Sequence, residues 1–553
     1  MPTAVALVAS GPHEERQPGR VRRWLSPLWR PFAWVARTSG QGYRRLTAFV
    51  VEHGVVAVVA TVVLLGATGL LYTRMQTDFL PHMDEGSIIL DYWTPPGTSL
   101  TDTDAMLVQA EKVIMALPDV SGYSRRTGTQ LGFFITEPNR GDYVIDLKPR
   151  AQRRAIDAVI EELRQRLAAS QPGLHTDFGQ LLEDNIGDLT GGTPQPIDVK
   201  IFGGELSTLQ AKARAAAKIV AGVAGVADVF DGIVIAGPAL DVHVDSWAAA
   251  RSGLTTDDIQ AAVDPAVVGS VVDQVRVGEK MYDLRVIADK QADLSRLPIR
   301  VPSGALLLLG DVARVTTGQP EAEIDRENLK TFIGVTARLS GRSLGQAMAE
   351  IRSAVAQKLP LVGGMSIEYG GLYAQQQASF RDLFYVLIVG LLLVSVVVLF
   401  EFADWRAPIV TALCALAVLT GVFLLLMVTG QTLNISSYVG AIMVVGIVGE
   451  NAIFVIHEAR LELRKGTPPR QAWRVAALRR ARPVAMTILA TACALAPIAV
   501  AIGQGSQLMQ PLAIAVIGGF ALSGPVVLLL LPGLYRLMDP HGRLGATRRP
   551  SGS

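Results

Sequence analysis

Six runs of mostly apolar residues constrain this chain more than any other feature of its sequence. One run comes early and five follow one another after a long, more polar interval: Gly54–Tyr72, Leu383–Phe400, Pro408–Val428, Val439–Ile456, Pro483–Ile502 and Pro511–Leu531. An α-helix needs about 20 such residues to cross the hydrocarbon core of a bilayer. The sequence therefore predicts a membrane protein with a bundle of six spanning helices.

Basic residues set the expected orientation of these helices. The first 53 residues are rich in arginine, and so is the loop Arg460–Arg482 between the fourth and fifth runs. Counting the spans places both segments on the same side, which the positive-inside rule makes cytoplasmic. Residues 1–53 also alternate aromatic side chains with arginines, which predicts an interfacial amphipathic helix, although a plain basic tail is the alternative. The aromatic residues are Trp24, Trp29, Phe32, Trp34 and Tyr43.

The interval between the first and second spans predicts a large α+β domain outside the membrane. Four amphipathic helical patterns recur in it, each followed by a short β-rich run, and their ranges are Leu100–Leu117, Ile156–Leu167, Leu206–Val223 and Leu344–Leu359. Extended segments precede or pair with them. This β-α-β order, used four times, predicts two ferredoxin-like sandwiches with two helices on one face of each sheet.

The same patterns predict the domain boundaries. The cytoplasmic basic segment is expected at 1–53, the first span at 54–74, and the first sandwich at 75–195. The second sandwich is expected at 196–240 and 320–381, interrupted by an inserted subdomain at 241–319. Five spans then occupy 382–538, and a cytoplasmic tail follows at 539–553.

Charge and cysteine content exclude several classes of function. The formal net charge is only +2, so nothing points to nucleic acid as a partner. The two cysteines, Cys414 and Cys493, both lie within apolar runs. Neither a disulfide framework nor a cysteine-based metal site is therefore expected.

Four motifs, found together with this order of spans and domains, carry a family resemblance. They are D-F-L-P-H-M-D-E-G (Asp78–Gly86), P-P-G-T-S-L (Pro95–Leu100), V-G-E-N-A-I-F-V-I-H-E (Val448–Glu458) and R-P-V-A-M-T (Arg482–Thr487). With them the chain resembles the C-terminal half of a resistance-nodulation-division (RND) efflux permease. The resemblance is closest to the heavy-metal-efflux branch, although the methionine cluster of that branch is not found.

This resemblance implies a secondary transporter, not an enzyme. It implies proton antiport in the cell inner membrane with no cofactor beyond the proton gradient, and a large periplasmic porter domain. It also implies a trimer that works with a periplasmic adaptor protein and an outer-membrane channel, with the inserted subdomain as the docking region. Complete members have twelve spans in two halves, so we expect a companion chain with the N-terminal half, which carries the family's proton-binding aspartate.

A second function remains open. The chain could be a membrane-anchored scaffold, or a truncated gene product, whose periplasmic domain only binds partners. The missing first half favours this alternative, whereas a carboxylate within the fourth apolar run speaks against it.

That carboxylate is Glu450. It lies about six residues inside the end of its apolar run, or roughly 9 Å along a helix, where an ionised group is costly unless it faces a bundle interior or a proton path. Helical spacing places it on one face with Met443, Gly446, Ile453 and His457. The structural alternative is a hydrogen bond to a neighbouring helix.

The resemblance implies specific roles for two residues of the spans. It makes Glu450 part of a proton relay, because the matching helix of the family carries a charged relay residue. It places Thr487, in the next span, beside that relay. Threonine hydroxyls also commonly bond their own helix backbone four residues back, which is the alternative for Thr487.

The substrate cleft is expected around residues that the resemblance places between the porter subdomains. The candidates are Tyr92, Trp93, Phe133, Phe134 and Arg140. Apolar and aromatic walls with a few polar groups would suit an amphiphilic organic molecule. Core packing or subunit contact is the alternative for these aromatic residues.

No metal site is expected in the sequence. Trp93 stands where the heavy-metal branch carries a methionine, and Arg140 stands near the position of another, so a soft-ligand site is not supported. The consecutive polar residues His82–Glu85 would alternate between the faces of an extended segment and could not converge on one ion. We therefore expect that expression of this chain together with its companion half raises the tolerance of cells to amphiphilic organic compounds more than their tolerance to copper or silver.

The orientation leads to a labelling prediction. Cysteines introduced at Ser207 and Ser343, in the periplasmic domain, should react with a membrane-impermeant thiol reagent in intact spheroplasts, because the domain is expected outside the membrane. A cysteine at Thr467, in the Arg460–Arg482 loop, should stay unlabelled. Labelling of the Thr467 variant would reverse the orientation.

Overall fold

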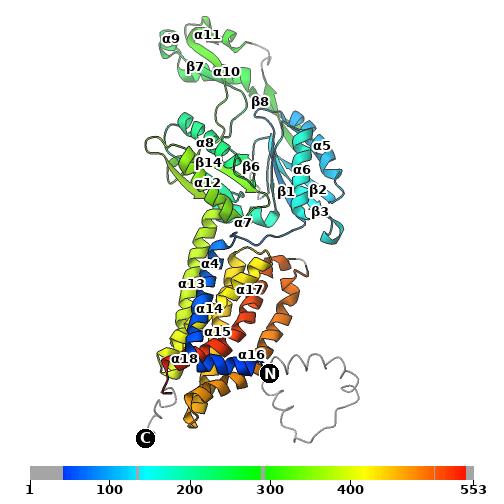
Figure 1. Ribbon diagram of the computed structural model, residues 1–553. Helices are drawn as coiled ribbons and strands as arrows, with labels where there is room; N and C mark the ends of the chain where they lie inside the picture. The colour runs from blue at the N-terminus through cyan, green and yellow to red at the C-terminus, as the bar shows by residue number, and fades with distance from the viewer. Residues whose placement is uncertain (1–41, 132–135, 288–292, 504, 543–553) are drawn as a thin grey trace. The chain divides into compact units, whose positions relative to one another are not determined.

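The computed structural model describes residues 42–131, 136–287, 293–503 and 505–542 of the chain. It divides into two compact units, one of residues 1–83 with 375–553 and one of residues 84–374 (Figure 1). The predicted interfacial helix lies outside the described residues except for Tyr43, which belongs to a helix over residues 42–52.

The first unit is a helical bundle. Its long apolar helices are α4 (Gly54–Arg74), α13 (Gly371–Phe402), α14 (Arg406–Val428), α15 (Ile435–Arg464) and α16 (Pro469–Ala499), followed by a last span over Ser506–Met538. That last span consists of α17 (Ser506–Pro525), a π-helical turn (Val526–Leu530) and α18 (Leu531–Met538). These six helices are long and apolar enough to cross a membrane, so the prediction of six spanning helices is confirmed.

Small residues allow the central helices of this bundle to approach closely. A Cβ added to Gly421 of α14 would come 2.4 Å from the carbonyl oxygen of Gly518 in α17, and the reverse substitution would meet Gly421 in the same way. Gly440 of α15 likewise faces the backbone of Leu512. Such small-residue contacts are a common basis of helix packing in membranes, where lipid and side chains are equally apolar.

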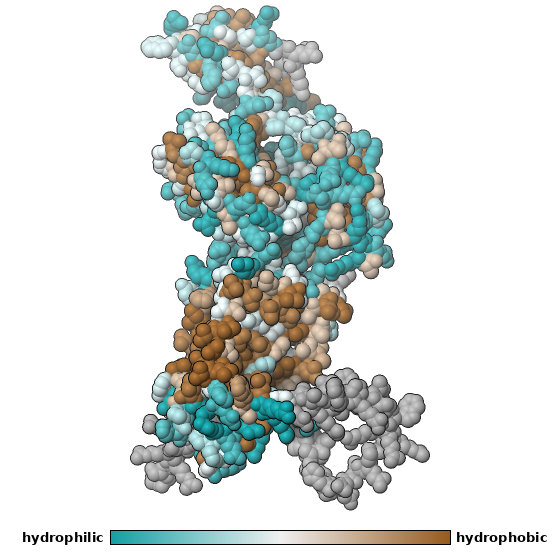
Figure 2. Space-filling view, in the orientation of Figure 1, coloured by the Kyte–Doolittle hydropathy of each residue, from teal (hydrophilic) through white to brown (hydrophobic). Residues whose placement is uncertain are grey.

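The outer helices of the bundle are less buried than the central ones. α14, α15 and the last span are mostly buried within the unit, whereas α4, α13 and α16 present most of their apolar surface outward. Figure 2 shows a broad apolar surface over the bundle, with hydrophilic side chains at its lower end. An outward apolar surface of this kind suits lipid or a further helical partner.

The second unit contains two larger sheets, each accompanied by helices, and three two-stranded sheets. The first sheet has the order β2-β3-β1-β4 and is antiparallel throughout. Its strands are β1 (Ser87–Trp93), β2 (Val120–Thr127), β3 (Arg140–Leu147) and β4 (His175–Gly179). Helices α5 (Leu100–Met115) and α6 (Ile156–Ser170) contribute the apolar side chains that pack on the inner face of β1 and β3.

The second sheet has the order β13-β14-β5-β15, with β6 also paired to β14. Its strands are β5 (Ile197–Phe202), β6 (Val226–Phe230), β13 (Asp325–Glu327), β14 (Lys330–Leu339) and β15 (Ser366–Gly370). Helices α8 (Leu206–Ala221) and α12 (Leu344–Lys358) accompany it. A further helix, α7 (Leu181–Gly191), follows β4 and leads into β5.

A small subdomain is inserted between β6 and β13. Strand β7 (Ala239–Val244) pairs with β12 (Ala313–Gly318), and both pack near the short helices α9 (Ser246–Arg251) and α11 (Leu309–Val312). Helix α10 (Thr256–Val267) begins at Thr255, whose side chain and Asp258 form a capping box. A hairpin of β8 (Ser270–Val277) and β9 (Lys280–Val286) and a pair of β10 (Pro298–Arg300) with β11 (Leu306–Leu308) complete it.

The predicted combination of a helical membrane bundle and an α/β domain is confirmed at this coarse level. The sequence did not predict α7, and the strand-like run Ala305–Val315 is in fact two strands separated by the turn of α11. Of the two labelling positions in the α/β unit, Ser207 is exposed, but Ser343 is buried with only 5% of its surface accessible. The labelling prediction therefore depends on Ser207.

Candidate functional site

A cavity of about 510 Å³ in the α/β unit has walls from both sheets and from α7. Its lining is strongly acidic, because nine carboxylates but only the basic side chains of Arg140 and Lys200 take part. The carboxylates are Asp91, Asp142, Asp177, Asp184, Asp188, Asp198, Asp228, Glu323 and Asp325. No methionine or cysteine is among the described lining residues.

Strand register aligns three of these carboxylates in one row. Asp91 of β1 pairs directly with Asp142 of β3 on one side and with Asp177 of β4 on the other. Directly paired residues lie on the same face of a sheet, with Cβ atoms about 5 Å apart. The alternating positions Ile88, Leu90 and Tyr92 face the helices instead, so the row occupies the face of the first sheet that is turned away from its core.

Three adjacent carboxylates repel one another, and arginines neutralise both ends of the row. Arg126 of β2 extends the row by one strand and donates from Nε and Nη2 to the two carboxylate oxygens of Asp142, at 2.6 and 2.9 Å. At the other end, Arg338 of β14 donates from Nε and Nη2 to Asp177, at 2.8 and 3.1 Å. Such two-pronged contacts are the strongest that a carboxylate makes with a side chain.

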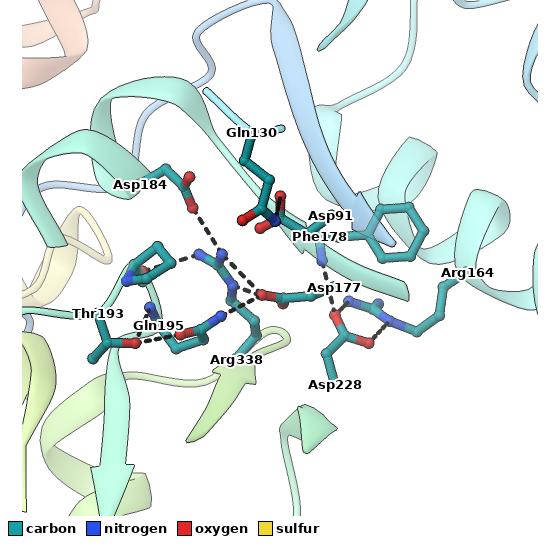
Figure 3. A network of polar contacts seen from close by, with 11 residues as sticks. Asp91, Gln130, Arg164, Asp177, Phe178, Asp184, Thr193, Gln195, Asp228 and Arg338 are labelled. Atoms are coloured by element: carbon teal, nitrogen blue, oxygen red, sulfur yellow. Dashed lines mark hydrogen bonds and ion pairs between the residues drawn. The ribbon is translucent and has the colours of Figure 1, made fainter. Parts of the chain in front are cut away.

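Arg338 is the centre of a wider network, which Figure 3 shows. Its Nη2 also donates to Asp184 of α7 at 2.8 Å, and its Nη1 donates to the carbonyl oxygen of Pro194 at 3.2 Å. Gln195 adds a 2.7 Å hydrogen bond from its amide nitrogen to Asp177. The Arg338 side chain is only 3% exposed, so this charge is fully enclosed by its partners.

A second arginine–aspartate pair joins the two sandwiches, but here the arginine belongs to the first sandwich and the aspartate to the second. Arg164 of α6 donates to both oxygens of Asp228 in β6, at 2.8 and 2.7 Å. Asp228 has a positive φ of 49°, and it also accepts a 3.3 Å hydrogen bond from the backbone nitrogen of Phe178. Each sandwich thus contributes one arginine that bonds an aspartate of the other: the second contributes Arg338 and the first contributes Arg164.

Asp91, at the middle of the row, has no arginine partner among the described residues. It accepts one hydrogen bond, at 3.1 Å, from the side-chain amide of Gln130. Burial raises the pKa of the Asp91 carboxyl well above its ordinary range, and the neighbouring charges of Asp184 and Asp177 raise it further. The crowded row therefore favours a proton, or another cation, at its centre.

Asp198 of β5 brings a further buried carboxylate to the cavity from the second sheet. Its Oδ1 is buried without a hydrogen-bond partner among the described residues, and its Oδ2 lies 3.9 Å from Nζ of Lys200. Glycines on the two adjacent strands, Gly334 and Gly370, leave room for it, since a Cβ at either would come 2.8 Å from one of its oxygens. Burial raises the pKa of Asp198 to about 6.

The structure places three of the predicted cleft residues at this cavity. Trp93 stacks on His175 with ring centroids 5.7 Å apart, and it meets Phe230 of the second sandwich edge-on at 5.2 Å. Tyr92 packs in the core of the first sandwich, where its hydroxyl donates to the carbonyl oxygen of Arg126 at 2.7 Å. Arg140 lies 3.4 Å from Glu137.

The described walls of this cavity combine carboxylates with aromatic and apolar side chains such as Trp93 and Phe230, so the predicted apolar and aromatic cleft stays a prediction. The two remaining predicted cleft residues, Phe133 and Phe134, lie outside the described part of the chain. Carboxylates are the most numerous charged groups of these walls.

The two predicted relay residues lie in the helical unit, on α15 and α16. Glu450 is exposed on the surface of this unit and has no hydrogen bond or ion pair within the described residues. Its predicted helix face is exposed as well at Met443, Gly446 and His457. Thr487 is also exposed, and its hydroxyl donates to the carbonyl oxygen of Pro483 at 3.2 Å, which is the bond to its own helix considered above. The structure shows no bond between Glu450 and Thr487.

A family model described as the AcrB/AcrD/AcrF family matches residues 1–539. The chain belongs to this family of RND permeases. Its relatives include the cobalt-zinc-cadmium resistance protein CzcA of Cupriavidus metallidurans, 29% identical over 97% of this chain and 50% of that protein. The nickel and cobalt resistance protein CnrA of the same species is 28% identical over 78% of this chain and 41% of its own length.

Solved structures agree with these sequence relatives. The crystal structure of a heavy metal efflux pump superposes with a TM-score of 0.81 and 28% identity, over 92% of this chain and 53% of that one. The chain therefore spans about half the length of the RND permeases that it matches, and its resemblance to the heavy-metal branch is confirmed.

Sequence reasoning missed the carboxylate row and Arg338. A signal was present, because Asp91, Asp142 and Asp177 each alternate with apolar residues in short β-rich segments. Their convergence depends on the order of the strands, which one sequence does not reveal. Asp184 and Asp188 were missed because α7 was not predicted.

The pKa of Asp198 leads to a stability prediction. The folded chain holds this proton up to about pH 6, whereas an unfolded aspartate releases it near pH 4. The raised pKa of Asp198 therefore contributes its full stabilisation to the folded state below about pH 4, and this contribution is lost as the pH rises through about 6. Asparagine cannot ionise, so Asp198→Asn should not lose this stability, and its free energy of unfolding at pH 8 should exceed that of the parent by up to about 3 kcal/mol.

Thermal unfolding of the full chain in detergent between pH 4 and 8 would test this prediction. Glu368→Gln, at an exposed position on the strand next to β5, is the matched control and should give no such pH-dependent gain. An Asp198→Asn variant that is less stable than the parent at pH 8 would show that the charged form is preferred.

Proposed function

We propose that this chain is one half of a proton-driven RND permease of the inner membrane, and that it exports cations, with divalent metal ions as the main class. The observation that supports this proposal is the acidic cavity, where nine carboxylates and only two basic side chains line the walls. A cavity of that charge attracts cations and repels anions. The named functions of CzcA and CnrA, resistance to cobalt, zinc, cadmium and nickel, belong to the same class of substrate.

The carboxylate oxygens of the lining limit which metal ions the cavity can bind. Carboxylate oxygens suit hard and borderline divalent ions, whereas copper(I) and silver(I) favour thiolate and thioether ligands. The described lining offers neither methionine nor cysteine. The expectation of low activity toward copper or silver thus remains, but a divalent cation now replaces the amphiphilic organic molecule as the proposed cargo.

The cavity as it stands is not a preassembled metal site. No three histidine, cysteine, aspartate or glutamate side chains among the described residues are placed to hold one ion. Arg126 and Arg338 direct the oxygens of Asp142 and Asp177 toward themselves. Binding of a cation would therefore require these carboxylates to rotate toward it, which couples occupancy to the arrangement of the two sandwiches.

The exposed face of α15 supports the proposal of a companion half. Glu450 lies on this face in a helix that would sit within the bilayer, and a carboxylate facing lipid is costly. Packing of another helical bundle on the face would enclose Glu450 and allow it to exchange protons with that bundle. The other half would come from a separate chain or from the rest of a longer one.

The remaining features of the proposed assembly rest on family membership. They are the proton antiport itself, with Glu450 and Thr487 in the relay, the periplasmic position of the α/β unit, and a trimer with an adaptor protein and an outer-membrane channel. The alternative of a non-transporting scaffold would leave both the acidic cavity and Glu450 without a purpose.

The cargo proposal predicts the effect of removing the middle charge of the row. Together with its companion half, the parent chain should raise the tolerance of a metal-sensitive strain to zinc or cobalt. Asp91→Asn should abolish most of that gain, because it removes a carboxylate with no arginine partner. Asp146→Asn, on β3 but outside the cavity, is the control and should behave like the parent. A gain in tolerance only to amphiphilic organic compounds would contradict the cation assignment.

The relay proposal predicts the effect of removing a titratable proton. Glu450→Gln should insert and assemble normally but abolish proton-coupled export, while Glu450→Asp should keep partial activity because it can still carry the proton. Proton uptake into vesicles during cation export would measure this.

Two further variants control the relay test. Glu458→Gln is expected to affect export little, although it removes the charge that pairs Glu458 with Arg479 and Arg480. Met443→Leu, on the exposed face of α15, is the cleaner control. Normal export by Glu450→Gln would assign Glu450 to packing.

A further inference from the structure

We propose that Arg338 is a resident counter-cation of the acidic cavity, that the exported cation displaces it from Asp177 and Asp184, and that this exchange releases one of the two arginine–aspartate contacts between the sandwiches. This inference rests on the proposed function, because it assumes a cationic cargo. It adds a residue that determines both cation selectivity and the coupling of binding to movement.

The Arg338 guanidinium donates hydrogen bonds to carboxylate oxygens that face the cavity. Asp177 and Asp184 both line the cavity, and both accept hydrogen bonds from Arg338 at 2.8 Å. A cation that enters must therefore either bind beside this guanidinium or take its place. Figure 3 shows the Arg338 guanidinium between the two aspartates, with Gln195 beside it on the same side of Asp177.

The end of β4 forms a slot that fits a flat group. A Cβ at Gly179 would come 2.8 Å from Nη1 and 3.0 Å from Cζ of Arg338, so only glycine allows the guanidinium to lie against this backbone. The carbonyl oxygen of Pro194 accepts Nη1 at 3.2 Å. The guanidinium therefore lies against backbone at Gly179 and Pro194, while carboxylates hold its other edge.

The contact that would be lost joins the two sandwiches. Arg338 belongs to β14 of the second sheet, whereas Asp177 and Asp184 belong to β4 and α7 beside the first sheet. The reciprocal pair of Arg164 and Asp228 does not involve these aspartates and would remain. Loss of the Arg338 contact would let the two sandwiches pivot about the contacts that remain, the Arg164–Asp228 pair and the Trp93–Phe230 ring contact.

Charge favours this exchange for a divalent ion in particular. Asp91, Asp177 and Asp184 are close enough to interact, yet Arg338, bonded to Asp177 and Asp184, brings only a single positive charge to them. A divalent ion brings two charges to the same oxygens at about 2.1 Å, closer than a guanidinium can approach. A monovalent ion offers no gain in charge over Arg338. The built-in arginine therefore selects against monovalent cations.

Zinc binding to the purified full chain in detergent would test the exchange by calorimetry. Arg338→Gln should bind zinc about tenfold more tightly or better, because the competitor is gone. Arg338→Lys is the decisive variant, because it keeps the charge but replaces the fork with a single point of contact. If the cation displaces residue 338, Arg338→Lys should also bind more tightly than the parent. If the cation binds beside it, the affinity of Arg338→Lys should equal that of the parent.

A distance measurement tests the release of the contact. Nitroxide labels would be attached to cysteines at Ala168 on α6 and Ala356 on α12, two exposed positions of different sandwiches, after replacing Cys414 and Cys493 by serine. Double electron–electron resonance should show a longer distance when zinc, which is diamagnetic, is added to the parent. Arg338→Gln should show the longer distance already without zinc. Arg126→Gln, which frees Asp142 within the first sheet alone, should not.

The outcomes separate this inference from the proposed function. Zinc binding in the cavity with an unchanged label distance in the parent, or equal affinities of Arg338→Lys and the parent, would overturn the exchange but leave the cation cargo intact. Absence of zinc binding in the parent and in every variant would overturn the cargo proposal and, with it, the exchange. A longer distance without zinc in Arg126→Gln would show that the labels report general loosening, and would also overturn it.

Discussion

Repulsion among neighbouring carboxylates is the constraint on which the α/β unit depends. Strand pairing fixes Asp142, Asp91 and Asp177 side by side on one face of the first sheet. Such a row is stable only when positive charge is supplied, and Arg126 and Arg338 supply it at the two ends. Because Arg338 belongs to the other sheet, neutralising the row also joins the two sandwiches. Charge balance in the cavity and the arrangement of the sandwiches are therefore one problem.

That link offers a physical route from binding to movement. A buried ion pair contributes little net stability while it is intact, but the loss of one partner leaves an uncompensated charge and is strongly destabilising. A cation that enters the cavity changes which partners the aspartates need. It can thus alter the relative stability of two arrangements of the sandwiches, which is what a ligand must do to cause a conformational change. In the proposed permease, the proton gradient would supply the energy that resets this equilibrium.

The sequence predicted some parts of this molecule and not others, for identifiable reasons. Long apolar runs predicted the six spanning helices, because the hydrophobic length requirement is local to each segment. Helical periodicity placed Glu450 on one face with Met443, Gly446 and His457, but it did not predict that this face is exposed in the described unit. The boundaries and the ferredoxin-like topology of the two sandwiches stay predictions. The acidic character of the cavity could not be predicted, because Asp91, Asp177 and Arg338 meet only through strand order and sheet-to-sheet packing. Among the aromatic candidates, Tyr92 packs in the core of the first sheet, whereas Trp93 lines the cavity beside Phe230.

The central claim is that the acidic cavity binds the cation that is exported. Anomalous X-ray diffraction at the zinc edge, from crystals of the full chain grown with zinc, tests it most directly because it locates the ion without assuming its ligands. We expect an anomalous peak inside the cavity, with the zinc ion coordinated by carboxylate oxygens of the row at about 2.1 Å. An empty cavity in crystals that bind zinc elsewhere on the chain would contradict it.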